Sequence, residues 1–301
     1  MEDNTRKESR AARWLTLLLK IAVTVACLWY VSGKIDFAKA GAALQKANWF
    51  YLFLALIAFV ISKWVAALRL NIYFRNIDIH LTASQNIKLY WLGMFYNLFL
   101  PGSISGDAYK VILLTKKYKL PYKKTTAAVL LDRFSGLLGL GLILAVYALL
   151  VLKNDLYVTV IIAGAVLAVL ALYFIIKFWL KDFISSFLPT LILGIVVQTS
   201  QVFCVYLIMS AMGIPIHVTE YVFIFLISSM VAVLPLTIGG LGAREVVFLE
   251  GSKYFGLAQE TSVIISLLFY LITLITSAVG LFYVYNDPFL EKKRDDISPV
   301  K

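Results

Sequence analysis

The stretch "LPGSISGDAYKVILL" at residues 100–114 decides the fold, because it interrupts an apolar helix and returns as "LPLTIGGLGAREVVFLE" at residues 234–250. Pro101 aligns with Pro235, 134 residues later, and several of the glycines and small residues that follow align as well. Proline removes a backbone donor and ends each apolar run, whereas glycine favours a turn. Chance similarity between two such turns is the alternative, but the shared order favours an internal duplication.

Composition places the chain in a membrane. Of its 301 residues, 61% are hydrophobic and 15% are charged, and the mean hydropathy is +0.86, which is too apolar for a soluble domain of this size. The net charge of +11 is attributed to cytoplasmic loops beside anionic lipid, and no nucleic-acid partner is expected. Six apolar runs are long enough to cross a hydrocarbon core of about 30 Å. They are 14–31, 49–70, 127–152, 156–176, 191–212 and 261–285.

Two shorter apolar runs, at 84–100 and 219–234, lead into the two breaks, and the basic residues decide whether they cross the bilayer. If both are re-entrant, 17 lysines and arginines lie inside and six lie outside; if both cross, the numbers become 10 and 13. The positive-inside rule therefore favours re-entrant hairpins. The expected fold is an all-α polytopic protein of the cell membrane, with about six transmembrane helices, two re-entrant helical hairpins and both termini cytoplasmic.

The two halves are expected to form inverted repeats within one membrane domain, residues 1–301. The first repeat covers about 14–152 and the second about 153–286, flanked by charged cytoplasmic tails at 1–13 and 287–301. Each repeat has the order span, span, hairpin, span, and the two hairpins enter from opposite sides. Many secondary transporters share this plan, with the binding site where the breaks meet.

Each break is expected to leave backbone amides exposed at membrane depth, which is tolerated only against protein or a wet cavity. Amides at a helix N-terminus attract anions, and hydroxyl groups add donors. A polar, anion-binding cavity is therefore expected between the breaks. Its candidate residues are Gly102, Ser103, Ser105 and Gly106 in the first break, and Thr237, Gly239, Gly240 and Gly242 in the second.

Asp132 and Arg133 are charged residues in the apolar stretch "AAVLLDRFSGLLGLG" (127–141), roughly 12 Å into a helix that starts near Thr125. Burying either alone would cost about 2.5–3.5 kcal/mol or more, so both need partners. Because sequence neighbours point to different helix faces, Arg133 is expected to face the first break and hold a phosphate. Asp132 is expected to pair with Lys88, Arg69 or Lys63. An ion pair that only fixes helix packing is the alternative, although the matching positions of the second half, Leu267 and Leu268, carry no charge.

Three further charged residues follow the breaks. Asp107 is expected to be the N-cap of the helix after the first break, with protonation or cation coupling as the alternative. Arg244 and Glu245 are candidates for an outer gate or for interfacial residues that reach water. The lysines between 110 and 124 indicate an interfacial helix and loop on anionic lipid. The run of Gly136, Gly139 and Gly141 is expected to permit close helix packing.

Three motifs carry a family resemblance: "NLFLPGSISGDAYKVILL" (97–114), "AAVLLDRFSGLLGL" (127–140) and "LPLTIGGLGAREVVF" (234–248). In this order and spacing they resemble the lysylphosphatidylglycerol synthase transmembrane family, also called flippase-like proteins. In the multiple peptide resistance factors, such a region translocates aminoacylated phosphatidylglycerol and a cytosolic domain attaches the amino acid. This sequence ends at Lys301 with a short charged tail, so lysyl transfer is not expected. By resemblance, the motif positions of the family are occupied by Gly102, Ser103, Gly106, Asp107, Asp132, Arg133, Gly239, Gly240, Gly242, Arg244 and Glu245.

The leading functional hypothesis is a flippase-like or scramblase-like transporter, not an enzyme, for an anionic phospholipid or a polyprenyl-phosphate-linked headgroup. No nucleotide-binding P-loop is present, so transport would be passive or driven by an ion gradient. One alternative is a membrane scaffold for a lipid-modifying or glycosyl-transfer enzyme. Another is an intramembrane lipid-phosphate enzyme, although the sequence shows no metal-ligand cluster or nucleophile–base pair. Cys27 and Cys204 lie in predicted spans, and neither a cofactor nor a metal is expected.

Overall fold

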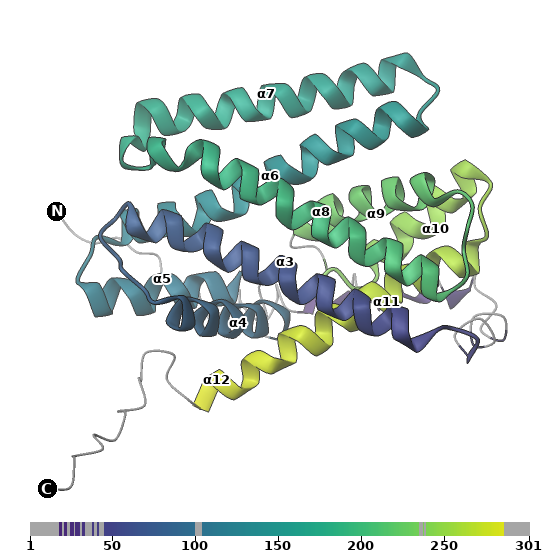
Figure 1. Cartoon of the computed structure of the whole chain (residues 1–301), viewed down its shortest axis with the longest axis horizontal. Coiled ribbons are helices and arrows are strands. Elements are labelled where there is room, and N and C mark those ends of the chain that lie inside the picture. Colours follow the sequence, from purple (N-terminus) through teal and green to yellow (C-terminus); the bar gives the residue numbers. More distant parts are fainter. Residues whose placement is uncertain are drawn as a thin grey trace, which may run out of the picture.

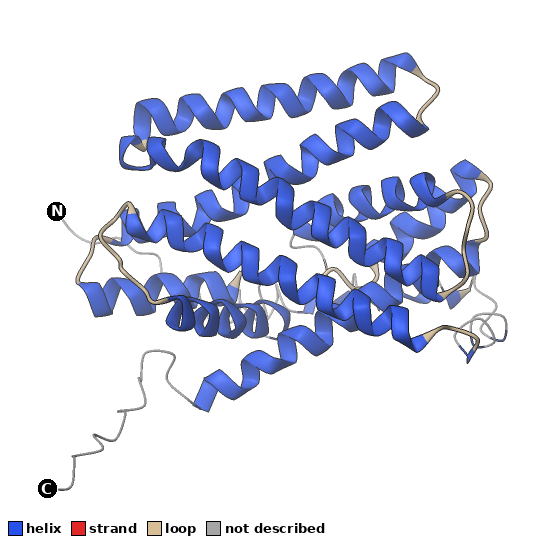
Figure 2. Ribbon diagram, viewed as in Figure 1, coloured by secondary structure: helices blue, strands red, loops and turns tan. Residues whose placement is uncertain are grey.

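The computed structural model describes residues 45–99, 104–234, 237 and 239–285, together with 18, 19, 21, 22, 25, 26, 28–30, 32, 33, 38 and 41. These residues are almost entirely helical and form no strand, which confirms the all-α prediction (Figure 2). In this part of the chain five segments are long and apolar enough to cross a membrane. They are Trp49–Arg75, Tyr122–Val151, Asp155–Trp179, Lys181–Ala211 and Gln259–Tyr285. Half of the first predicted span and both predicted tails lie outside the described residues.

The helices follow the predicted apolar runs and stop at the predicted breaks. In chain order they are α3 (Trp49–Arg75), α4 (Ala83–Phe99), α5 (Ser105–Tyr118), α6 (Tyr122–Val151), α7 (Asp155–Trp179), η1 (Lys181–Ser186), α8 (Phe187–Ala211), α9 (Val218–Val233), α10 (Ala243–Phe255), α11 (Gln259–Ala278), η2 (Val279–Leu281) and α12 (Phe282–Tyr285). Local signals fix several ends. Asn48 caps α3 by accepting from the Phe50 N–H, and Asn154 caps α7 by accepting from the Leu156 N–H, both over 3.0 Å.

Helices α3 and α8 form an antiparallel pair through the middle of the molecule (Figure 1). At one end the Asn48 N–H donates to the Ala211 carbonyl over 2.8 Å. Towards the other end the hydroxyl oxygens of Tyr73 and Thr190 lie 2.7 Å apart and share a hydrogen bond. Hydrogen bonds at both ends therefore fix the register of the pair.

The helix pairs α4–α5 and α9–α10 lie in opposite halves of the molecule (Figure 1), and Leu98 near the end of α4 packs against Gly239 of the second break. The loops at 76–82 and 119–121 lie at one end of the molecule, whereas those at 152–154 and 212–217 lie at the other (Figure 1). A helix that ends near the middle of the molecule and is followed by a second helix in the reverse direction leaves the polar backbone of the turn at that point. This arrangement positions the candidate site.

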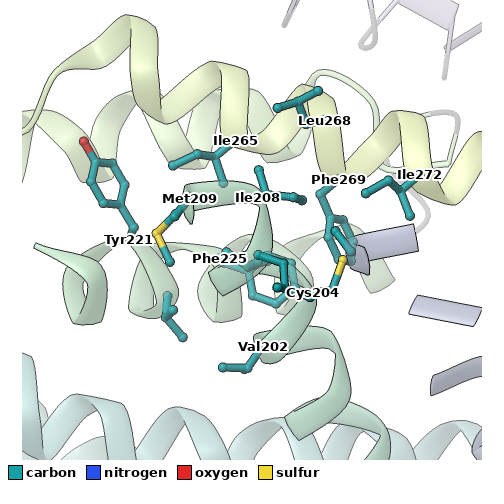
Figure 3. Packing of buried hydrophobic residues seen from close by; sticks show 14 of the residues in the cluster. Val202, Cys204, Ile208, Met209, Tyr221, Phe225, Ile265, Leu268, Phe269 and Ile272 are labelled. Carbon is teal, nitrogen blue, oxygen red and sulfur yellow. The ribbon is translucent and has the colours of Figure 1, made fainter. Parts of the chain in front are cut away.

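Two apolar clusters flank that middle region. One joins α8, α9 and α11, where Phe225 and Phe269 pack edge to face with ring centroids 4.7 Å apart (Figure 3). The other joins the second half of α3 to α5, α6 and α7. On α3, Phe59 belongs to the first cluster and Leu70 to the second. Lys63 and Arg69 of α3 lie between these two positions.

Candidate functional site

The first break separates Phe99, the last residue of α4, from Ser105, the first residue of α5. Two predicted site residues, Gly102 and Ser103, fall in this interval and lie outside the described residues. The remaining predicted residues of both breaks are described.

The start of α5 is held against the end of α4 by side-chain and backbone contacts. The Gly106 N–H donates to Asn97 Oδ1 over 2.9 Å, and the Ser105 hydroxyl donates to the Tyr96 carbonyl over 2.5 Å. A Cβ atom at position 106 would collide with the backbone of Gly93. The tight hairpin therefore depends on the glycine at position 106.

The second break is a glycine turn closed by a buried carboxylate. Gly239, Gly240 and Gly242 have φ angles of +61°, +83° and +85°, which side-chain-bearing residues rarely adopt. Glu245, with 0% of its surface exposed, accepts from the Gly242 N–H over 2.6 Å and from the Ser266 hydroxyl over 2.8 Å. Glu245 thus caps α10 from the inside, and the interpretation that it reaches water at the interface is wrong.

Two other predicted residues of the second half are also placed. Arg244 lies over the ring of Phe269, 5.1 Å from its centroid, and its Nη1 donates to the Ser229 hydroxyl over 3.3 Å. Thr237 is buried. Arg244 is half-buried inside the protein, and no observation tests whether it acts as a gate.

A cavity of about 340 Å³ lies where the two breaks meet. Asn97 and Leu98 contribute to its wall from the first break, and Val233 and Gly239 contribute from the second. The remaining wall comes from α3, α4, α5, α6, α9 and α11. The predicted site residues on this wall are Asp107, Asp132, Arg133 and Gly239. Those that do not line it are Ser105, Gly106, Thr237, Gly240, Gly242, Arg244 and Glu245.

Two sets of ion pairs join the helices around the cavity. Arg69 Nε on α3 lies 2.8 Å from Asp132 Oδ1 on α6, and both side chains are at most 10% exposed. The Asp107 carboxylate on α5 contacts Arg133 Nε on α6 and lies 3.1 Å from Lys110 Nζ on its own helix. Consecutive residues Asp132 and Arg133 therefore serve different partners, as predicted from their different helix faces.

The charges on the cavity wall do not cancel. Four basic side chains and two acidic side chains line it: Lys63, Arg69, Lys110 and Arg133, with Asp107 and Asp132. Lys63 Nζ lies over the Phe59 ring, 4.5 Å from its centroid. No carboxylate of the described residues lies within salt-bridge distance of Lys63. The wall thus carries a formal excess of two positive charges.

The expectation that Asp107 is an N-cap is wrong. Ile104 occupies the N-cap position of α5, and Asp107 is the third helical residue. Its carboxylate is near the positive end of the helix, where an acidic side chain is favourable, but it contacts the side chains of Arg133 and Lys110. The described amides at Gly106 and Gly242 already have acceptors inside the protein. These two amides are therefore not free to bind an anion, whereas cationic side chains line the cavity.

The prediction that Lys110 belongs to an interfacial helix and loop is wrong, because Lys110 lines the cavity. Only 4% of its surface is exposed, and its Nζ lies over Tyr90, 4.8 Å from the ring centroid. The helical spacing of three residues from Asp107 is the signal that could have identified it. Lys63 and Arg69 were considered only as partners of Asp132, although basic residues inside an apolar run already indicate a functional cavity.

The fold and the cavity define a multi-pass, all-helical membrane protein with a charged cavity between two broken helix pairs. The chain belongs to the family described as the lysylphosphatidylglycerol synthase TM region, which matches residues 17–185 and 176–280. It is also similar to the UPF0104 membrane protein PH1989 of Pyrococcus horikoshii, with 24% identity over 174 residues. That match covers 56% of this chain and 51% of the relative, so it spans about half the length of that protein.

Proposed function

We propose that the protein is a flippase-like transporter, not an enzyme, and that the headgroup of an anionic lipid crosses the membrane through the cavity between the two breaks. The carrying observation is the excess of two positive charges on the cavity wall. Cations at membrane depth are costly unless they are paired or hydrated. A phosphate group would supply the missing negative charge, and its oxygens accept several hydrogen bonds from arginine and lysine.

The proposed topology consists of transmembrane helices with α4–α5 and α9–α10 as re-entrant hairpins of opposite orientation. The end of the molecule with the 76–82 and 119–121 loops carries the larger number of exposed basic residues. They are Arg75, Lys116, Lys117, Lys119, Lys123, Lys124, Lys177 and Lys181. By the positive-inside rule this end is assigned to the cytoplasm, together with both chain termini.

Inverted repeats complete the proposed topology, because α3–α4–α5–α6 and α8–α9–α10–α11 have the same order of long helix, broken pair and long helix. In this plan the cavity lies near the midplane, where alternating access is built by moving one repeat against the other. Asp107 would act as an internal anion. A lipid phosphate would displace the Asp107 carboxylate from Arg133 and Lys110, and the carboxylate would pair with them again after the lipid is released.

Headgroup translocation in proteoliposomes tests the proposal. Lys63→Gln and Arg133→Gln each remove a cation from the cavity wall, and Lys116→Gln removes an exposed cation elsewhere as the matched control. The proposal predicts that both cavity variants slow the translocation of an anionic phospholipid while the control does not. Equal rates for all four proteins, each above the protein-free background, would rule out this cavity as the path.

A second candidate is a membrane scaffold for a lipid-modifying or glycosyl-transfer enzyme. The exposed lysines of the 116–119 segment favour it, because they form a cationic surface at the end of α5. Co-purification of such an enzyme, lost in a variant with glutamine at Lys116, Lys117 and Lys119, together with an absence of lipid translocation, would support the scaffold over the transporter.

A further inference from the structure

A groove of about 950 Å³ runs between α6 and α7, separate from the charged cavity. Small residues on both helices line it, yet they do not bring the helices together. A Cβ atom added at Gly141 or Gly164 would meet no atom within 4 Å, whereas one at Gly139 would lie 2.5 Å from the backbone of Gly194. Small side chains in the α6–α7 interface therefore leave an apolar space instead of a close contact.

The length of the groove matches a long hydrocarbon chain. Its wall on α6 extends from Tyr122 to Leu144, a rise of about 33 Å at 1.5 Å per residue. That length equals the full hydrocarbon depth of a bilayer, about 30 Å, whereas an acyl chain of a phospholipid reaches about half of it.

The groove and the charged cavity share two helices as walls. On α6, Leu131 and Phe134 line the groove, while Asp132 and Arg133 between them line the cavity. At about 100° per residue, Arg133 lies only about 20° around the helix from the groove-lining Thr126. On α9, Met230 lines the groove and Ala232 lines the cavity. A lipid with its phosphate in the cavity could therefore lay its chain along α6.

We infer that this groove holds the isoprenoid chain of a polyprenyl phosphate whose headgroup enters the charged cavity. This inference rests on the proposed function and narrows its substrate to one class of anionic lipid. Two observations carry it: the length of the groove exceeds one leaflet, and the cationic wall beside the groove complements a phosphate. Tyr122 and Lys123 place polar groups at one mouth of the otherwise apolar groove.

Binding of defined lipids to the purified full-length protein tests the inference. The probes are a long-chain polyprenyl phosphate and a diacyl phosphatidic acid, which share a phosphomonoester headgroup and differ in their chains. The groove is filled by the double substitution Gly164→Leu and Ala168→Leu. Ala163→Leu is the matched control, because Ala163 is an exposed residue of the same helix that does not line the groove.

The filled groove is expected to weaken polyprenyl phosphate binding by about tenfold or more, equivalent to about 1.4 kcal/mol, and to leave phosphatidic acid binding nearly unchanged. The control variant should bind both probes like the wild type. Equal weakening for both probes would overturn the assignment to an isoprenoid chain, and no weakening for either would show that the groove holds only bulk membrane lipid.

The headgroup site is tested separately with Lys63→Gln, which is expected to weaken both probes. If Lys63→Gln weakens both and the filled groove weakens neither, the groove inference fails and the proposed function stands. If Lys63→Gln weakens neither, the cavity is not the phosphate site and the proposed function fails with it.

Discussion

The Arg69–Asp132 pair predicts a large and specific loss of stability when one partner is removed. Arg69 Nε and Asp132 Oδ1 are 2.8 Å apart, with side-chain exposures of 5% and 10%. The Arg69 guanidinium has little room to move, because Gly136 and Gly194 pack against it. Asp132→Leu would therefore leave an uncompensated buried cation, and breaking a buried pair in this way costs about 3–5 kcal/mol.

The double variant separates this pair from ordinary packing loss. Replacing both partners of a buried ion pair by apolar residues of similar size is often neutral or stabilising. Leucine at position 132 also reproduces the residue at the matching position of the second half, Leu267. Arg69→Met with Asp132→Leu is thus expected to recover most of the stability that either single substitution loses.

Reversible unfolding by SDS in mixed micelles, followed by tryptophan fluorescence, measures the stability of the wild type, the two single variants and the double variant, which together form a double-mutant cycle. Asp182→Asn is the control, because Asp182 pairs with Lys124 at a surface where both side chains are about half exposed. That substitution should leave stability almost unchanged. The reasoning would be refuted if Asp132→Leu unfolded within about 1 kcal/mol of the wild type, or if the double variant lost the sum of both single effects.

Three further predictions follow from local contacts. Gly139→Ala should destabilise the protein because its Cβ would press on the Gly194 backbone, whereas Gly141→Ala should stabilise it by up to about 1 kcal/mol through helix propensity; the same unfolding assay distinguishes the two signs. Glu245→Ala should cost about 1–3 kcal/mol or more, because it leaves the buried Gly242 N–H unsatisfied, and Glu245→Gln should recover part of that loss in thermal melts. Lys63→Met should leave the melting temperature close to that of the wild type, because no carboxylate of the described residues lies within salt-bridge distance of Lys63, and it should still reduce anionic-lipid binding; a large drop in melting temperature would contradict this.

Much of the fold was predictable because the length and hydropathy of a segment identify it as a membrane helix. The expected run at 84–100 became α4 (Ala83–Phe99), and that at 219–234 became α9 (Val218–Val233). Helix ends set by proline or by a loop asparagine follow local rules that one sequence can carry. The number of spans stays a prediction, because half of the first run lies outside the described residues.

The site was less predictable, because its partners come from different helices. Asp107 looked like an N-cap by its place after a glycine, but Asn97, nine residues earlier on another helix, accepts the Gly106 N–H instead. No local rule specifies such a contact. Lys110 looked interfacial because it begins a run of lysines, and its burial depends on how α5 folds back against α4. Asp132 and Arg133 could be identified from the sequence, because a charge inside an apolar run needs a partner. The same rule applies to Lys63 and Arg69.

The two breaks differ in how their helix N-termini are neutralised, and this difference bears on transport. Asp107 and Glu245 are both the third residue of their helices, α5 and α10. Glu245 is sealed from solvent and its oxygens accept from neutral donors on Gly242 and Ser266, so its removal would leave those donors unsatisfied. Asp107 instead pairs with the cations Lys110 and Arg133 on the cavity wall, which would keep an anionic partner if a phosphate replaced the carboxylate. Under the proposed function, the first break is therefore where the substrate exchanges, and the second break is a fixed wall against which it is held.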